Sequence, residues 1–207
     1  MNPTDDSSRR APGRPRLQAG GVSMRETVLG AASRLFMELG YEPVSINMIA
    51  EHAGVTKASV YYYFENKAEL FTTSVIEMFV RVRMRTMAIL EDEGDLRARL
   101  SKLARTKLSR THTDFESMMK EAVPFLTEEQ LQSIRKAEHG IHEGLAEAFR
   151  AEMDKGELAP GDPMMLSHAF SALLMLGNRE RFGERKPSVE ELAEGVVELF
   201  WNGAARR

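Results

Sequence analysis

The sequence predicts an all-α protein with an N-terminal helix-turn-helix domain of three helices and a C-terminal helical bundle, about nine helices in all. Three observations support this fold class. Apolar residues recur every three or four positions along most of the chain, which is the spacing of a buried helix face. Residues that start helices (Ser, Thr, Asp, Asn) and residues that stop them (Gly, Pro) separate these runs. No segment alternates apolar and polar residues as a half-buried strand would.

The first helix is predicted from Ser23 to Leu39. Ser23 can cap this helix, with Glu26 at the capping-box position three residues later. Gly40 can end it, because glycine readily adopts the left-handed conformation found after many helices. The buried stripe of this helix would consist of Val28, Ala31, Leu35, Phe36 and Leu39.

The next stretch, residues 45–67, predicts two short helices joined by a tight turn. Ser45 can cap the first helix and Thr56 the second, while Gly54 supplies the left-handed residue between them. Ala50 is small enough for two helices to cross closely, and Val60 continues the buried face of the second helix. These are the steric requirements of a helix-turn-helix, whose second helix enters the major groove of DNA.

The outer face of this second helix is polar or amphipathic. Lys57 and Ser59 are placed to meet base edges, and Ala58 could touch a thymine methyl group. The hydroxyls of three consecutive tyrosines, residues 61–63, and the amine of Lys67 are placed to meet phosphates. The alternative is that the tyrosines are core aromatics, but they point in three directions around a helix and one core cannot hold them all.

Here the chain resembles the DNA-binding domain of TetR/AcrR-type bacterial transcriptional regulators. The resemblance covers about residues 24–71 and includes the run L-G-Y-E-P-V-S-I-N-M-I-A-E-H-A-G-V-T-K-A-S-V-Y-Y-Y-F-E-N-K-A-E-L-F. It implies a TetR-like fold. It also implies phosphate contacts by Ser45, Thr56, Tyr61, Tyr63 and Lys67. The positions that would meet or flank bases are Asn47, Lys57, Ala58, Ser59 and Tyr62. Many members of the family have histidine at the position of Tyr63, but a phenol can also hydrogen-bond a phosphate.

Before the first helix, residues 1–21 are rich in Pro, Gly, Ser and charge, and we expect a disordered arm. Arg14 and Arg16 belong to a narrow, extended segment that could enter a minor groove. The alternative is a solvated tail with only a general attraction to DNA. Residues 22–67 would then form the DNA-binding domain, and residues 68–207 a domain for ligand binding and dimerisation.

The rest of the chain also has a helical pattern. Asn66 can cap a long helix that reaches Leu90 and would join the two domains as a rod. Further helices are predicted over residues 95–110, 114–123 (stopped by Pro124) and 127–156, and from residues 162 and 188 onward. The last two helices are strongly apolar. By the family resemblance they would form the interface of a homodimer, although they could also be core of the monomer, on different faces.

The resemblance also implies a cavity for a small molecule between the long helix and the bundle. Candidates for an adaptable apolar lining are Met84, Met87, Phe115, Met118, Met119, Phe149 and Met175, with Phe125 and Phe170 as further possibilities. Each could instead be ordinary core packing. These residues favour a hydrophobic or amphipathic effector. His139 and His142 are three apart on a helix, which permits a metal pair, but an exposed pair is the simpler interpretation. No metal or cofactor is expected.

Composition limits the remaining classes of function. The chain has no cysteine, which excludes disulfides and thiolate metal sites, and it has no apolar run near the roughly 18 residues that would span a membrane. No secretory signal is evident, so we expect a cytoplasmic protein without a membrane partner. The spacing of residues indicates no catalytic set, and an enzyme is not expected. The formal net charge of −3 does not itself indicate a DNA-binding protein, so that prediction depends on the motif.

Taken together, these features predict a homodimeric transcriptional repressor. The dimer would bind a palindromic operator in double-stranded DNA and leave it when a small molecule binds. The alternative is a helical protein-interaction module in which the helix-turn-helix is vestigial.

Overall fold

A computed structural model describes residues 23–109, 115–175 and 187–204, which form helices and the turns between them, without a strand in these ranges. The helices are α1 (Met24–Leu39), α2 (Ile46–Ala53), α3 (Lys57–Tyr63), α4 (Lys67–Leu90), α5 (Leu96–Leu108), α6 (Phe115–Ala122), α7 (Glu128–Asp154), α8 (Pro163–Leu174) and α9 (Val189–Ala204). A short 3-10 helix, η1 (Val123–Phe125), joins α6 to α7. The predicted all-α fold is therefore confirmed for these residues. The N-terminal arm, with Arg14 and Arg16, lies outside them.

The helices start where the sequence predicts. At these positions a polar side chain accepts a hydrogen bond from an otherwise unpaired N–H group in the first turn. At α1 the Ser23 hydroxyl accepts from the Glu26 N–H (3.2 Å), and the Glu26 carboxylate accepts from the Ser23 N–H (2.8 Å). Ser188 and Glu191 form the same reciprocal pair at α9, at 2.9 and 3.1 Å. The other described caps are Ser45, Thr56, Asn66, Asp95, Thr127 and Asp162.

The segment around Pro124 differs from the prediction. The expected helix over residues 114–123 ends one residue earlier, at Ala122, and Pro124 lies inside η1 instead of after a plain stop. Proline lacks an N–H and disfavours the α conformation in the residue before it, so the chain tightens into a 3-10 turn. This turn presents the side chain of Phe125, which is 56% exposed.

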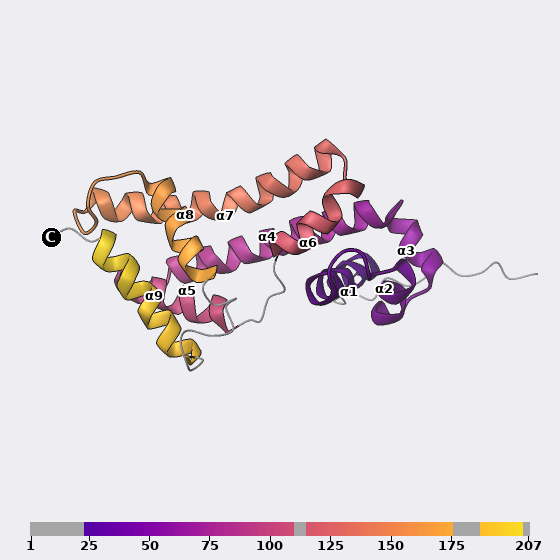
Figure 1. Cartoon of the computed structure of the whole chain (residues 1–207), viewed down its shortest axis with the longest axis horizontal. Helices are drawn as coiled ribbons and strands as arrows, with labels where there is room; N and C mark the ends of the chain where they lie inside the picture. The colour runs from indigo at the N-terminus through magenta and orange to yellow at the C-terminus, as the bar shows by residue number, and fades with distance from the viewer. Residues whose placement is uncertain (1–22, 110–114, 176–186, 205–207) are drawn as a thin grey trace, which may run out of the picture.

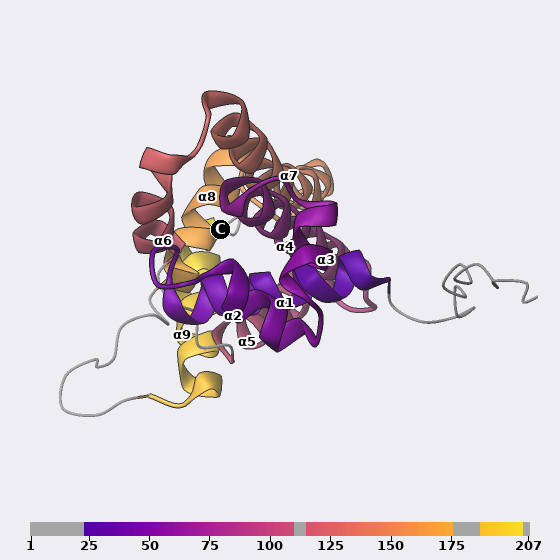
Figure 2. The same ribbon diagram turned by 90° about the vertical axis from the view of Figure 1, so that its right-hand side faces the viewer.

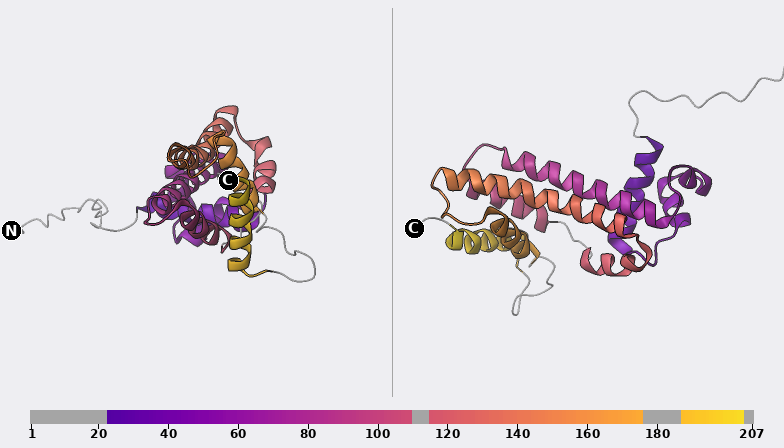
Figure 3. Two further views of the ribbon diagram at one scale, coloured as in Figure 1. Left: turned by 90° about the vertical axis from the view of Figure 1, so that its left-hand side faces the viewer. Right: turned by 90° about the horizontal axis from the view of Figure 1, so that it is seen from above.

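Two long helices form the axis of the molecule. α4 and α7 run side by side along most of its length (Figures 1 and 3). At one end α1, α2 and α3 gather around the start of α4 (Figure 2), and at the other end α9 packs against α5 and α8. Within the described ranges, no helix is both long and apolar enough to cross a membrane.

The buried apolar residues form two clusters along this axis. The first contains α1–α3 and the first half of α4, and it also takes in Met118 and Ala122 of α6 and Ile134 of α7. The second joins the end of α4 to α5, α7, α8 and α9. The first core thus continues past residue 67, so the helix-turn-helix end shares its interior with helices from later in the chain.

A nearly buried ion pair joins α5, α7 and the end of α4. Arg99 on α5 donates to Glu152 on α7 (3.0 Å) and to the carbonyl of Leu90 at the end of α4 (2.6 Å). Lys155 donates to the same carboxylate at 2.9 Å. Glu152 is only 7% exposed. Because a buried charge is costly unless it is paired, these two cations stabilise the carboxylate.

Candidate DNA-binding surface

The turn between α2 and α3 has the geometry that the sequence predicts. Gly54 lies in the left-handed region (φ 65°, ψ 32°), and the Val55 N–H donates to the Ala50 carbonyl at 2.9 Å. Ala50 is 5% exposed and Val60 is fully buried, which lets α2 and α3 pack closely. One face of α3 therefore packs against α2 and the core, and the opposite face of α3 is open to solvent.

That solvent face of α3 carries much of the predicted set. Lys57 and Ala58 are exposed, Tyr61 is 48% exposed and Tyr62 is 81% exposed. The Lys57 amine lies 5.8 Å from the centre of the Tyr61 ring. At 81% exposure most of the Tyr62 side chain is open to solvent, so it is available to a partner.

The hydroxyls of the predicted set act as helix caps. Thr56 Oγ1 accepts from the Ser59 N–H at 3.1 Å and lies 2.9 Å from Ser59 Oγ, and Ser45 Oγ accepts from the Met48 N–H at 3.2 Å. They mark the N-terminal ends of α2 and α3, where free N–H groups favour an anion such as phosphate. Asn47 is exposed on α2 beside Ser45. Phosphate contacts by these residues stay a prediction.

Two residues predicted to contact phosphates, Tyr63 and Lys67, are less exposed than the other three. Tyr63 is half-buried, packs against the first core, and meets the Tyr62 ring edge to face at 4.9 Å. The Lys67 amine folds back: it donates to the Glu42 carbonyl (3.2 Å) and lies 4.2 Å from the centre of the Tyr41 ring. Burial lowers the pKa of Lys67, although the carboxylates of Glu42 and Glu121 act against that shift. A phosphate contact by Lys67 would require its side chain to swing outward.

One contact that sequence reasoning missed joins α6 to the loop after α1. A single carboxylate oxygen of Glu121 accepts from the Tyr41 N–H (2.9 Å) and the Glu42 N–H (3.2 Å). Gly40 has φ 84°, and a Cβ there would lie 2.8 Å from the same oxygen. The glycine that ends α1 therefore also makes room for this carboxylate. We call the contact of Glu121 with these two amides the α6 latch.

The residues predicted to bind an effector do not surround one cavity in this structure. Phe149 and Met118 are buried, at 0% and 1% exposure, in different cores, whereas Met84 and Met175 are 67% and 50% exposed. The Met87 side chain on α4 packs against Gly144 on α7, where the two helices lie close together. The remaining two, Phe115 and Met119, line a common cavity. Helical spacing predicted the inward direction of several of these side chains but could not assign them to a core.

That cavity lies between α6 and α7, has a volume of about 480 Å³, and has a charged rim. Beside Phe115 and Met119 it includes Lys120, Arg135 and Glu138. Burial, with a contribution from nearby Glu116, raises the pKa of Glu138. Apolar walls with a charged rim suit an amphipathic molecule.

The two histidines considered as a metal pair make separate contacts. His139 Nε2 lies 3.8 Å from Glu143 Oε1, whereas His142 Nδ1 is 3.2 Å from Ser167 Oγ, and its ring lies 4.1 Å from that of His168 on α8. The described residues contain no group of three or more His, Cys, Asp or Glu side chains that could hold a metal ion.

His142 gives a prediction about pH. Burial, together with neighbouring His168 and His139, lowers its pKa. The folded protein then binds fewer protons here than the unfolded chain does. The stabilising contribution is therefore complete above about pH 6.5 and lost as pH falls through the lowered pKa. We expect His142→Asn to make the free energy of unfolding less sensitive to acid, measured by urea unfolding at about pH 7.5 and pH 5.5. Exposed His52 is the matched control, and an equal effect of His52→Asn would contradict this assignment.

Known proteins resemble this chain in the sequence of the helix-turn-helix and in the overall fold. Residues 28–73 match the family model "Bacterial regulatory proteins, tetR family". Across 181 residues the chain is 20% identical to the HTH-type transcriptional regulator YhgD of Bacillus subtilis, covering 86% of this chain and 95% of YhgD. The fold resembles the reduced form of E. coli NemR, with a TM-score of 0.73, 20% identity, and coverage of 88% of this chain and 98% of NemR. It also resembles Bacillus subtilis FadR solved with stearoyl-CoA (TM-score 0.64, 18% identity, 86% and 97% coverage).

Proposed function

Because the chain is a DNA-binding transcriptional regulator of the TetR family, we propose that it is a repressor that binds a palindromic operator as a homodimer and leaves it when an effector binds. Regulation, not catalysis, is the activity of this family. The observation that carries the proposal is the exposed face of α3, where Lys57, Ala58, Tyr61 and Tyr62 stand clear of the core. Repression, as opposed to activation, follows the family resemblance.

On this proposal the α3 surface is divided between two tasks. Lys57, Ala58, Ser59 and Tyr62, with Asn47 from α2, meet or flank the bases. Phosphates are held by Ser45, Thr56, Tyr61, Tyr63 and Lys67, which fix the register without reading sequence. The arm over residues 1–21, with Arg14 and Arg16, adds contacts in the minor groove.

A homodimer through α8 and α9 is the second part of the proposal. These helices expose large apolar side chains, with Met165 62% and Leu199 61% exposed, while Phe170 and Phe200 are buried in the monomer. The two helices thus have one face in the core and another that a second copy could cover. A twofold dimer would present two copies of α3 to the two halves of a palindrome. Residues 68–207 would then serve dimerisation and effector binding, in a cytoplasmic protein.

We further propose a hydrophobic or amphipathic effector. The relative FadR was solved with stearoyl-CoA, a molecule with both a long apolar tail and a charged head. In this chain the cavity beside Phe115 and Met119 combines apolar walls with four charged side chains: the cations Lys120 and Arg135 and the acids Glu116 and Glu138. The other candidates from the sequence do not line this cavity: Met84, Met87, Met118, Phe149 and Met175.

The α6 latch offers a route from the effector to the DNA. An effector beside α6 that bound better to a state with this helix displaced would pull the Glu121 carboxylate from the Tyr41 and Glu42 amides. The operator-binding orientation of α2 and α3 would then be less populated. This is coupling through differential affinity for two states.

We expect Glu121→Ala to loosen the loop after α1 without unfolding the protein. The two amides lose a charged acceptor, and each such hydrogen bond typically contributes about 1.5–3 kcal/mol. Hydrogen exchange of the Tyr41 and Glu42 amides should therefore become at least tenfold faster. The control is Lys120→Ala, at the preceding, exposed position of α6. Unchanged exchange at both amides in Glu121→Ala would refute the latch.

The experiment that tests the proposed function is selection of random duplex DNA on the purified protein, followed by sequencing of the enriched pool. A palindromic site with half-sites one or more helical turns apart is the expected result. The selected site then reports release by candidate effectors and, in a promoter, repression or activation. Salt-sensitive binding without sequence preference, with and without candidate ligands, would favour the alternative of a protein-interaction module with a vestigial helix-turn-helix.

A further inference from the structure

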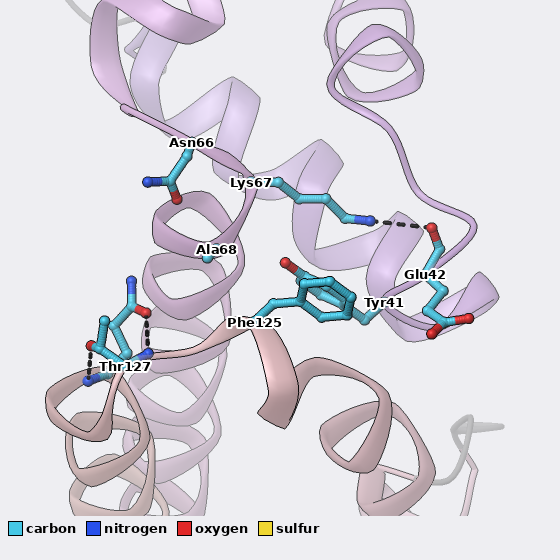
Figure 4. Close-up of a pocket in the computed structure, with 8 residues that line it drawn as sticks. Tyr41, Glu42, Asn66, Lys67, Ala68, Phe125 and Thr127 are labelled. Carbon is cyan, nitrogen blue, oxygen red and sulfur yellow. Dashed lines mark hydrogen bonds between the residues drawn. The ribbon is translucent and has the colours of Figure 1, made fainter.

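A second cavity, of about 510 Å³, lies where the helix-turn-helix end meets the start of α7. Its walls come from three separate parts of the chain: Tyr41 and Glu42 after α1, residues 66–68 at the start of α4, and Phe125 with Thr127 and Gln130 (Figure 4). This cavity is distinct from the one beside Phe115 and Met119, with which it shares no lining residue. It is within the size range of small-molecule sites.

The cavity has an aromatic wall. The rings of Tyr41 and Phe125 lie 5.4 Å apart between centres, tilted by 31°. Tyr41 is 4% exposed and packs on Phe36 and Phe71 behind it, whereas Phe125 is 56% exposed on the turn that contains Pro124. A planar ring stacked against Phe125 would cover apolar surface that the described part of the chain leaves open.

Beside the aromatic wall lies the cation of Lys67, on which the carboxylates of Glu42 and Glu121 act only from a distance. The Lys67 amine donates to the Glu42 carbonyl at 3.2 Å and lies over the Tyr41 ring, and it forms no ion pair with any carboxylate in the described residues. An ammonium has three N–H donors; the Glu42 carbonyl takes one and the Tyr41 ring faces the amine, so at least one donor remains for a ligand. In Figure 4 the Glu42 carboxylate lies well apart from the Lys67 amine.

The polar side chains around the cavity also offer donors. Asn66 uses its amide oxygen to cap α4 (2.9 Å from the Glu69 N–H), and Gln130 uses its own to accept from the Thr127 N–H at 2.9 Å. Their oxygens are therefore engaged, while their amide NH₂ groups remain as donors. An aromatic wall, a cation and amide groups in one cavity match a ligand with a ring and an anionic group.

We propose that this cavity binds a small aromatic carboxylate, with its ring against the exposed Phe125 side chain and its carboxylate on the Lys67 amine. The carboxylate would form a charge-assisted hydrogen bond in a partly desolvated site, where such bonds are stronger than at an open surface. The ring supplies the contact area, and the Lys67 amine distinguishes the acid from its neutral amide.

The test is a titration of the full-length protein with three probes: benzoate, benzamide and acetate. Calorimetry measures affinity, and amide chemical shifts locate the site. We expect benzoate to bind with a dissociation constant of about 1 mM, which is reasonable for so small a ligand. Benzamide should bind more weakly and acetate negligibly. Shifts should be centred on the amides of Tyr41, Lys67 and Phe125.

Three variants separate the parts of the site. Phe125→Ala should weaken benzoate about tenfold through loss of the stacked ring. Lys67→Met should remove the preference for benzoate over benzamide. Val80→Ala is the control at an exposed apolar position, since Val80 on α4 is 48% exposed and lines neither cavity; it should bind benzoate like the parent. Absent binding, shifts centred on α8, or equal affinity of Phe125→Ala and the parent would each overturn the proposal.

A consequence for regulation rests on the proposed function. If Lys67 contacts an operator phosphate, a bound carboxylate competes for its amine, and benzoate should weaken operator binding by the parent but not by Phe125→Ala. Calorimetry without DNA tests the site independently. Benzoate binding without any change in operator affinity would contradict the phosphate role of Lys67, while leaving the site itself established.

Discussion

Replacing Phe71 by alanine is expected to destabilise the helix-turn-helix end of the molecule strongly and so to weaken operator binding. Phe71 on α4 is fully buried and meets Phe36 of α1 and Tyr41 edge to face, each at 5.0 Å between ring centres. Loss of a buried phenylalanine ring costs about 3–5 kcal/mol. That is a large fraction of the roughly 5–15 kcal/mol that stabilises a typical domain. Urea unfolding followed by circular dichroism measures the effect.

Phe125→Ala is the matched control for this experiment, because Phe125 contacts the same Tyr41 ring at 5.4 Å but is 56% exposed. Its removal leaves no cavity in the core, so the unfolding midpoint should change little. If Phe71→Ala unfolded at the same denaturant concentration as the parent, the contacts of Phe71 with Phe36 and Tyr41 would not stabilise the packing of α4 on α1.

The helix boundaries were predictable because they depend on neighbours in sequence. The Ser23–Glu26 pair and the Thr56 cap each join residues three apart, and the left-handed Gly54 is a property of one position. Such interactions can be read along the chain without knowing the fold. The motif from Ser45 to Lys67 could therefore be identified, together with the α3 side chains that face solvent.

Contacts between distant segments could not be predicted in this way. Glu121 lies 80 residues from Tyr41, and nothing near it in sequence distinguishes it from other glutamates on helix surfaces. Gly40 indicated a helix end but not the carboxylate that approaches it. Likewise, the spacing of Met118 and Phe149 predicted buried faces, but two cores share α7, and only packing decides which side chain belongs to which.

The fold-back of Lys67 illustrates the same limit for the DNA-binding set. Its position in the motif suggested an outward amine, whereas the structure holds it over Tyr41, a residue 26 positions earlier in the chain. Lys57 is different, because its amine lies beside Tyr61 on its own helix and both are open to solvent. Of the two lysines, Lys57 is therefore the better placed to reach a base without rearrangement.

Lys57→Ala is accordingly expected to lower the preference for operator over random DNA. A good base contact contributes about 1–3 kcal/mol of discrimination, and a twofold dimer makes each contact twice, so the dimer should lose about 2–6 kcal/mol. The specificity ratio should thus fall by at least about thirtyfold. The measurement is the dissociation constant for the selected operator and for a scrambled duplex, at one salt concentration.

Lys67→Ala provides the contrast, because a lost phosphate contact weakens binding to both duplexes alike and reduces the salt dependence of affinity. The ratio of the two dissociation constants should then stay close to that of the parent. If Lys57→Ala behaves in the same way as Lys67→Ala, Lys57 contacts phosphate and not a base. Sequence reading would then move to the neighbouring exposed side chains of α3, first of all Tyr62, which is 81% exposed.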